Sequence, residues 1–177
     1  MPPPDVSDLR RLNHLVGEDF YFLSYSILLT LRILPSRGTA FRDHRKLGHV
    51  VQFISDTRLL SVLDRNRDKP VDNGVDRELL FAAYAKAEML KRETYKLLLS
   101  MHGRGLVQAE PNSNLGVVDV TLKDDAIDEA FFEDRLFEQE RTNARTLRAL
   151  VPRLSTLTME TFLEKVYVKR GVRAWAL

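Results

Sequence analysis

The sequence of 177 residues contains no cysteine. Disulfides, thiol nucleophiles and cysteine-ligated zinc are therefore excluded, and the composition fits a reducing compartment. Long apolar runs are also missing, because the most hydrophobic stretch, residues 20–34, is interrupted by Arg32 and is shorter than the roughly 18 apolar residues of a membrane span. The first residues lack the basic and apolar regions of an export signal. We therefore expect a cytoplasmic protein that does not enter a membrane.

Catalytic motifs are missing as well. The sequence has no phosphate-binding glycine loop, serine elbow, paired-histidine zinc helix or calcium loop. His44 and His49 are five residues apart, about 140° on a helix, whereas shared metal ligation needs a spacing of three or four. Acidic pairs such as Asp124 and Asp128 have no histidine or nucleophile nearby and indicate a solvated face. We expect no enzyme activity, metal, cofactor or small-molecule substrate.

The net charge of +2 conceals two opposed blocks. Residues 123–140 contain 2 basic and 8 acidic side chains, and residues 141–177 contain 8 basic and 2 acidic ones. A uniformly basic nucleic-acid binder does not need such a dense acidic block, so the charge gives little support for DNA binding. The split also complements the dipole of a helix over residues 123–150. The basic tail is left to contact DNA or an acidic partner.

Apolar spacing predicts a mostly helical chain. Residues 20–34 are apolar almost all round, which indicates a central buried helix or, alternatively, a helix that a partner subunit covers on one side. Helices are also expected over residues 40–55, 123–150 and 159–169, the last closed by Gly171. The turn-rich residues 64–74 are the clearest internal boundary.

The stretch 79–123 has the order of parts of a winged helix. Residues 75–84 and 90–102 predict a helix-turn-helix with a break near 85–87 or, alternatively, one helix over 77–102. Gly103 is expected to form the left-handed cap of this helix, and Gly105 adds a second joint. Residues 106–110 and 115–122 flank a turn at 111–114 and predict a hairpin.

The predicted fold is therefore mostly α with one small β-hairpin. We expect a winged-helix-like core at residues 71–123, an N-terminal helical region at 1–70 and a C-terminal helical region at 124–177. At this length the three regions are expected to form one compact unit.

Four aromatic residues are candidate partner contacts. Phe20, Phe22 and Tyr25 lie on the broadly apolar helix. Trp175 is the only tryptophan and lies two residues from the end of the sequence. We expect it to fill a groove or be held by a partner, because an exposed indole forfeits about 200 Å² of burial.

Basic residues on the predicted helix and wing are candidate nucleic-acid contacts. They are Lys86, Lys91, Arg92, Lys96 and Arg104, which would meet phosphates if this helix entered a major groove. Glu88 and Glu93 alternate with them, and mixed signs on one helix are typical of a solvated face or a protein contact. The wing is thus expected to be a docking platform rather than a DNA-reading unit.

The order of parts resembles the small middle component of bacterial three-component ABC systems, the Lamassu-type anti-phage defences. The resemblance is carried by the apolar helix at 20–34, by RELLFAAYAKAEMLKRETYKLLLSMHGRGLVQ at 77–108 and by ERTNARTLRALVPRLSTLTMETFLEKVY at 140–167. It implies a non-catalytic subunit that bridges an SMC-like ATPase and an effector and meets DNA through that complex. It offers no functional residue to transfer. The alternative is a winged-helix transcription regulator that reads an operator as a dimer.

Overall fold

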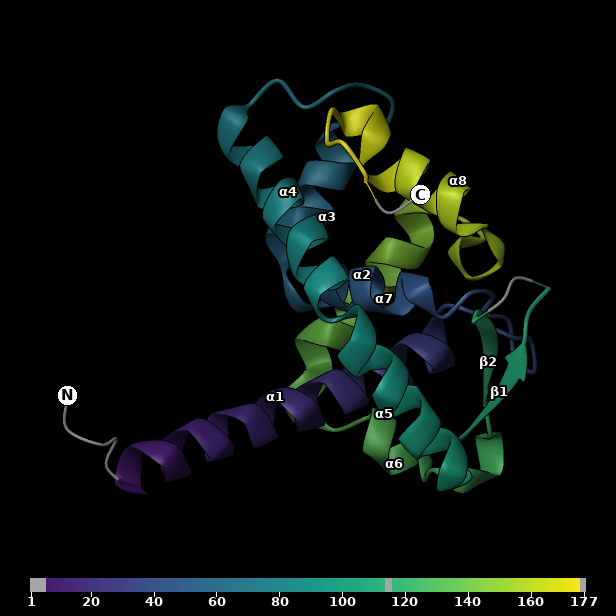
Figure 1. Cartoon of the computed structure of the whole chain (residues 1–177). Coiled ribbons are helices and arrows are strands. Elements are labelled where there is room, and N and C mark those ends of the chain that lie inside the picture. Colours follow the sequence, from purple (N-terminus) through teal and green to yellow (C-terminus); the bar gives the residue numbers. More distant parts are fainter. Residues whose placement is uncertain (1–5, 114–115, 176–177) are drawn as a thin grey trace.

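The computed structural model describes the backbone of residues 6–113 and 116–175 and the side chains of residues 20–113 and 116–175 (Figure 1). The helices are α1 (Val6–Ile33), α2 (Arg45–Ser55), α3 (Thr57–Arg65), α4 (Gly74–Met89), α5 (Lys91–Gly103), α6 (Glu129–Phe132), α7 (Glu138–Leu150) and α8 (Met159–Val166). Short 3-10 turns are η1 (Asp124–Ala126), η2 (Arg135–Phe137), η3 (Leu154–Thr156) and η4 (Val168–Arg170), and the strands are β1 (Val107–Pro111) and β2 (Val118–Leu122). The prediction of a mostly α fold with one small β-hairpin is confirmed.

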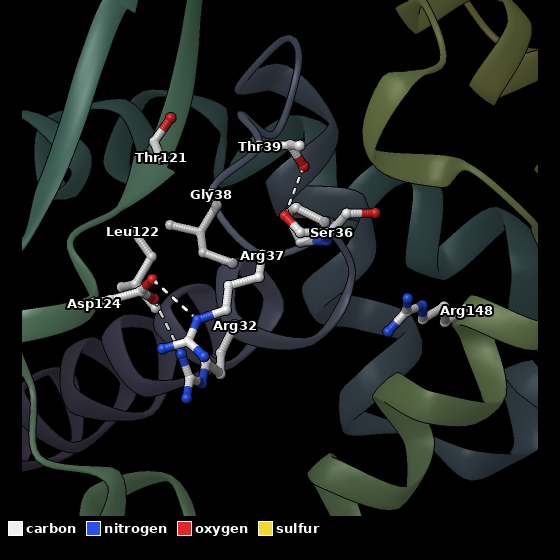
Figure 2. Close-up of a pocket in the computed structure, with 11 residues that line it drawn as sticks. Arg32, Ser36, Arg37, Gly38, Thr39, Thr121, Leu122, Asp124 and Arg148 are labelled. Atoms are coloured by element: carbon white, nitrogen blue, oxygen red, sulfur yellow. Dashed lines mark hydrogen bonds and ion pairs between the residues drawn. The ribbon is translucent and has the colours of Figure 1, made fainter.

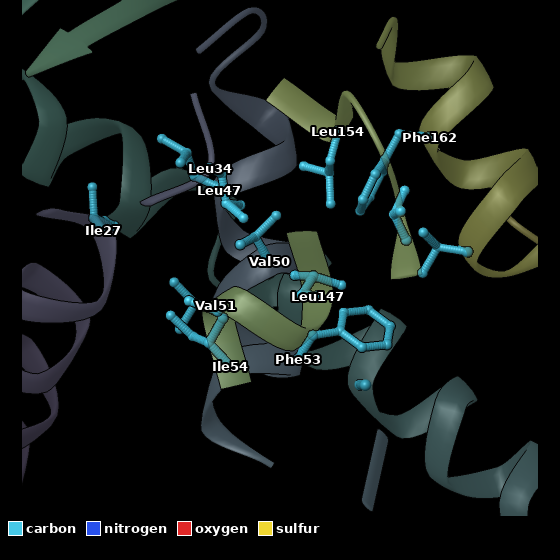
Figure 3. Packing of buried hydrophobic residues seen from close by; sticks show 14 of the residues in the cluster. Ile27, Leu34, Leu47, Val50, Val51, Phe53, Ile54, Leu147, Leu154 and Phe162 are labelled. Carbon is cyan, nitrogen blue, oxygen red and sulfur yellow. The ribbon is translucent and has the colours of Figure 1, made fainter. Parts of the chain in front are cut away.

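The helix at the centre of the molecule is α2, which packs against α1, α3, α4, α5, α7 and α8. Every residue from Lys46 to Ile54 is buried. Figure 3 shows Val50 and Phe53 of this helix close to Leu147 of α7. The prediction that residues 20–34 form the central helix was therefore wrong in its placement, although the second half of α1 does form one wall of the core.

The two halves of α1 have different surroundings. Ile27 and Leu29 are fully buried, whereas the N-terminal half of the helix projects away from the rest of the molecule (Figure 1). The helix begins at Val6, twelve residues before Glu18, where the sequence predicted its start. Among the described residues, no helix has both the length and the apolar character that crossing a bilayer requires.

The α4–α5 segment bends at one residue. Leu90 has φ −84° and ψ 0°, and its N–H donates to the Lys86 carbonyl at 3.1 Å. The predicted break near residues 85–87 was wrong, and so was the alternative of one uninterrupted helix, because α4 continues to Met89 and α5 starts at Lys91. A one-residue joint leaves the two helices closer to end-to-end than a three- or four-residue turn would.

Gly105, rather than Gly103, supplies the left-handed residue after α5. Gly103 lies inside the helix, and Gly105 has φ +75°. The N–H of Leu106 then donates to the Met101 carbonyl at 3.0 Å. This bond satisfies a carbonyl at the helix end and directs the chain into β1. The expected cap therefore exists but lies two residues later.

The hairpin pairs in antiparallel register, from Val107 opposite Leu122 to Pro111 opposite Val118. The second strand begins at Val118, three residues later than the predicted start. Residues 114 and 115, which belong to the predicted turn and strand, lie outside the described residues. The hairpin itself is confirmed and follows directly after α5, whereas the winged helix stays a prediction.

Both outer edges of the hairpin are occupied. On the β2 side, Phe41 and Val120 exchange backbone hydrogen bonds of 2.7 and 2.9 Å. On the β1 side, the N–H of Ala109 donates to Nδ1 of His102 at 3.2 Å, and Pro111 has no N–H. The bridge at Phe41 also explains why the helix predicted over 40–55 begins only at Arg45: the preceding residues pair with the hairpin.

The single helix predicted over residues 123–150 is divided into η1, α6, η2 and α7. Two aspartates cause the divisions, since each caps a new turn. Asp128 accepts from the Ala130 N–H at 3.0 Å, and Asp134 accepts from the Leu136 N–H at 2.9 Å. Short polar side chains favour such caps over helix interiors. Two of the eight acids in residues 123–140 are therefore explained by local caps, and the dipole argument applies only within α7.

The last helix, α8, ends at Val166, three residues before the predicted end. The turn η4 continues it, and Gly171 follows with φ +84°. The prediction that Gly171 closes this end is confirmed, and its left-handed conformation is the reason.

Candidate protein-docking site

An apolar groove lies at the base of the projecting half of α1, where α1 passes over α2 and the α4–α5 joint. Its volume is about 280 Å³. We call it the α1 groove, and its lining residues are Phe20, Phe22, Leu23, Val51, Gln52, Ser55, Lys86, Leu90 and Glu93. The aromatic side chains come from α1, and Leu90 is the residue at which α4 bends into α5. The bend therefore supplies one apolar wall of the groove.

Exposed aromatic side chains continue from the groove along α1. The Phe20 side chain is 41% exposed although it lines the groove, and Tyr21 is 81% exposed. Apolar surface gains roughly 25 cal/mol per Å² when it is removed from water. Phe20 and Tyr21 therefore keep apolar surface exposed to water, and a partner protein that covered it would gain binding free energy.

Two opposite charges, Lys86 and Glu93, line the groove. Neither Lys86 nor Glu93 has an ion-pair partner among the described residues. They lie on α4 and α5, on either side of Leu90. An apolar floor with one cation and one anion suits the apolar face of an amphipathic helix flanked by charges of both signs.

The structure places two of the predicted partner residues in this groove and two elsewhere. Phe20 and Phe22 line it. Tyr25 is only 3% exposed and stacks on Phe137 with ring centroids 3.5 Å apart, so the prediction of a partner contact there was wrong. On an α-helix, Tyr25 lies about 140° around the axis from Phe20, which turns it toward the chain's own core.

Trp175 is partly covered by the chain itself. Its ring stands perpendicular to Tyr84 at a centroid distance of 4.6 Å, and its backbone N–H donates to the Tyr84 hydroxyl at 2.9 Å. The side chain is still 58% exposed. Trp175 does not line the α1 groove. It forms a separate exposed site where residues after η4 pack against α4.

The candidate nucleic-acid residues are not equivalent. Lys86 lines the groove, and Arg92, Lys96 and Arg104 are exposed on α5 and just after it. Lys91 is engaged, because its Nζ lies 3.3 Å from Glu88 Oε2.

The same Glu88 carboxylate approaches His49 Nε2 at 3.1 Å, and this hydrogen bond lowers the pKa of Glu88 below its ordinary value. The first turn of α5 therefore has one of its two basic residues neutralised within the chain.

Sequence reasoning missed a buried lysine. Lys46 on α2 is completely buried, and its Nζ donates to the carbonyls of Leu154, Ser155 and Leu157 at 2.8, 3.1 and 2.6 Å. Burial lowers the pKa of Lys46 to about 7. The ammonium holds the turn between α7 and α8 against α2, and no local pattern in the sequence shows this, because lysine is almost always exposed.

The histidines also have structural partners. His49 is buried, with Nδ1 3.1 Å from the Tyr167 hydroxyl, and burial lowers its pKa. His44 Nδ1 accepts from the Val118 N–H at 3.2 Å. Within the described part of the chain, no three histidine, aspartate or glutamate side chains gather as metal ligands would.

Comparison of the chain with protein-family models, with curated proteins and with solved structures gave no match. The candidate docking site therefore stands on the geometry of α1, α2 and the α4–α5 joint.

Proposed function

We propose that this chain is a non-catalytic adaptor subunit that binds a partner protein through the α1 groove and the projecting half of α1. The observation that carries the proposal is the position of Phe20 and Tyr21. They are exposed at the base of a helix of 28 residues, which is about 42 Å long at 1.5 Å per residue. Because α1 is packed only at its C-terminal end, its projecting half offers a helical surface that a second protein can bind (Figure 1).

The partner we propose is an amphipathic helix of an SMC-like ATPase, with an effector as the second partner and DNA contacted through the complex. The resemblance to the Lamassu-type middle components supports this choice. The groove supports the helical form, because Phe22, Val51 and Leu90 provide an apolar floor, and Lys86 and Glu93 at its side have no ion-pair partner among the described residues.

Co-expression with the proteins encoded by neighbouring genes, followed by gel filtration, tests the proposal. The native chain is expected to co-migrate with one of them. A double substitution, Phe20→Asp with Tyr21→Asp, is expected to weaken the complex by about 30-fold, the effect of losing one binding hot spot. Failure of the native chain to co-migrate with any neighbour-encoded protein contradicts the proposal.

Val75→Asp is the matched control. Val75 is 73% exposed at the start of α4, where an aspartate is compatible with the helix N-terminus. This variant introduces one aspartate, half the charge of the double variant, on an exposed apolar residue away from the groove. It is expected to leave the complex intact, and equal loss in both variants would show that the groove is not the contact.

The winged-helix regulator is the second candidate, and the sequence of α5, β1 and β2 with exposed Arg92 and Lys96 favours it. It ranks lower because Glu88 engages Lys91. A mobility-shift assay at two salt concentrations on the DNA upstream of the gene tests it. A regulator gives a specific shift that Lys91→Glu with Arg92→Glu abolishes.

A further inference from the structure

A second cavity, of about 380 Å³, lies at the other end of the buried half of α1 (Figure 2). It is bounded by the end of α1, residues 35–39, the end of β2, η1 and α7. We call it the arginine pocket because Arg32, Arg37 and Arg148 line it. The three arginines come from segments far apart in the sequence, and Figure 2 shows Arg148 across the pocket from the other two.

Arg32 is fixed by carboxylates. Its Nη1 donates to Asp124 Oδ1 at 3.0 Å, and its Nη2 donates to Glu129 Oε2 at 2.5 Å. These contacts, led by the hydrogen bond to Glu129, raise the pKa of Arg32. Arg32 is therefore a paired, positioned charge that forms one wall rather than a free ligand-binding group.

Arg37 and Arg148 are held less firmly by carboxylates than Arg32 is. Arg37 Nε is 3.6 Å from Asp124 Oδ2, and its side chain is 82% exposed. Arg148 has no carboxylate partner among the described residues and donates only to the Ile33 carbonyl, at 3.1 Å. Counting Asp124 and Glu129, the three arginines leave one net positive charge at the pocket, with most donor hydrogens of Arg37 and Arg148 uncommitted.

Like charges follow one another along α7. Arg141, Arg145 and Arg148 are spaced by four and three residues, so they share a helix face where neighbouring charges of one sign are unfavourable. A third cavity, of about 270 Å³, is lined by all three of them together with Arg32 and with the carboxylates of Glu129 and Glu133, so four arginines face two acids there. Arg145 has no hydrogen-bond partner in the described part of the chain. An anion bound between these side chains would relieve their repulsion.

Hydroxyl donors complete the pocket. Ser36 and Thr121 line it, and their hydroxyls make no hydrogen bond among the described residues. Thr39 is committed, because its Oγ1 donates to the Ser36 carbonyl at 2.7 Å. Gly38, with φ +74°, shapes this turn. Guanidinium and hydroxyl donors around one space are the groups that recognise phosphate oxygens.

We propose that the arginine pocket binds a phosphate group through Arg37 and Arg148, assisted by the hydroxyls of Ser36 and Thr121. Arg32 is a positioning residue, since Asp124 and Glu129 hold it in place. The volume suits one nucleotide-sized ligand. The phosphate comes either from a free nucleotide or from a nucleic-acid backbone. This inference is independent of the docking function proposed above.

Titration of the purified full chain with inorganic phosphate, with ATP and with a short single-stranded DNA tests the inference. Binding to at least one probe is expected, and Arg37→Gln with Arg148→Gln is expected to weaken it about tenfold or more. Both side chains are exposed, so the variant is expected to fold. Arg77→Gln, on the exposed face of α4, is the matched control and is expected to bind like the native chain.

The probes separate the two sources of phosphate. Binding of ATP that is lost in the double variant indicates a free nucleotide, and binding of DNA alone that is lost in it indicates a nucleic-acid backbone. Absence of binding to all three probes overturns the inference. Binding that the double variant retains also overturns it, because the anion would then lie elsewhere.

Asp124→Asn provides a readout that a purely structural role would not produce. This substitution removes a carboxylate that pairs with Arg32 and is also the nearest counter-charge of Arg37. Phosphate binding is therefore expected to tighten about threefold. Weaker binding in this variant, in a protein that keeps its native circular dichroism, would contradict the role given to the arginines.

Discussion

The two ends of the well-packed half of α1 differ in chemistry. Near Phe20 the α1 groove is largely apolar, and near Arg32 the arginine pocket is largely polar and charged. Apolar contacts gain free energy from released water and depend little on salt, whereas contacts between exposed charges are screened by it. One helix therefore presents two surfaces whose binding responds to different conditions.

Both surfaces depend on the same scaffold. α2 packs against the buried half of α1 and contributes Val51 to the groove, and α7 packs against both α1 and α2 and contributes Arg148 to the pocket. Differences between the two surfaces can be measured only while this scaffold is intact. Variants that damage the scaffold should affect both surfaces, and variants at one surface should affect that one alone.

The largest expected effect is loss of both surfaces together. Lys46→Ala removes the ammonium that three carbonyls accept from and leaves a cavity in the core, and it is expected to lower the free energy of unfolding by about 3 kcal/mol. Urea denaturation followed by circular dichroism measures this. Lys165→Ala, on the exposed side of α8, is the control and should change stability by less than about 0.5 kcal/mol.

Salt should separate the two surfaces. Between about 0.05 M and about 0.5 M NaCl, phosphate binding at the arginine pocket is expected to fall about tenfold, because Arg37 and Arg148 are exposed. Capture of the partner at the α1 groove is expected to change by less than about twofold. Titration calorimetry and quantitative pull-down measure the two effects. An equal loss at both sites would mean that charge rather than apolar contact governs the groove.

A substitution at Gly38 is expected to change binding at the arginine pocket and to leave the α1 groove unaffected. Gly38 has φ +74° and no atom within 4 Å of an added Cβ, so Gly38→Ala costs about 1 kcal/mol through backbone strain and not through a clash. Phosphate binding should weaken a few-fold while the partner is captured normally. Gly74→Ala is the matched control, since that glycine also has free space around it and no positive φ.

The smallest expected effect concerns pH. Burial lowers the pKa of His49 below its ordinary value of 6.5, so the unfolded chain binds a proton more readily than the folded one. The contribution of His49 to stability is therefore complete above about pH 6.5 and decreases as the pH falls toward the pKa of His49 in the folded state. Unfolding curves at pH 7 and pH 5 should show this decrease, and His49→Gln should reduce it. An unchanged decrease would assign it to other groups, such as Glu88, whose pKa is also lowered.

The sequence was sufficient to predict the features that depend on local order. The helical content, the hairpin after α5 and the end of the last helix at Gly171 follow from spacing and turn chemistry within a few residues. The division of residues 123–150 was also readable in principle, because Asp128 and Asp134 each precede a short helical turn as a cap does. The split into an acidic and a basic half suits the dipole of one long helix, but it suits several short helical turns equally well.

The candidate sites were harder to predict because they join distant parts of the chain. Phe20 and Phe22 were identified from hydrophobicity, but the groove that they line needs Leu90 at a bend that no glycine or proline marks. Arg32 and Arg148 are separated by 116 positions, and only the packing of α7 against α1 brings them to one cavity. Spacing rules describe neighbours on one element and do not reach across such distances.

The occupied edges of the hairpin limit how this chain can assemble. With the Ala109 N–H used by His102 and with Pro111 beside it, β1 cannot template an added strand, and Phe41 already fills the corresponding place on β2. The small sheet is thus protected against edge-to-edge aggregation, even in a crowded assembly. A partner that binds by adding a strand therefore has no site on this hairpin. Contacts with other proteins are expected to use the helices of this chain instead.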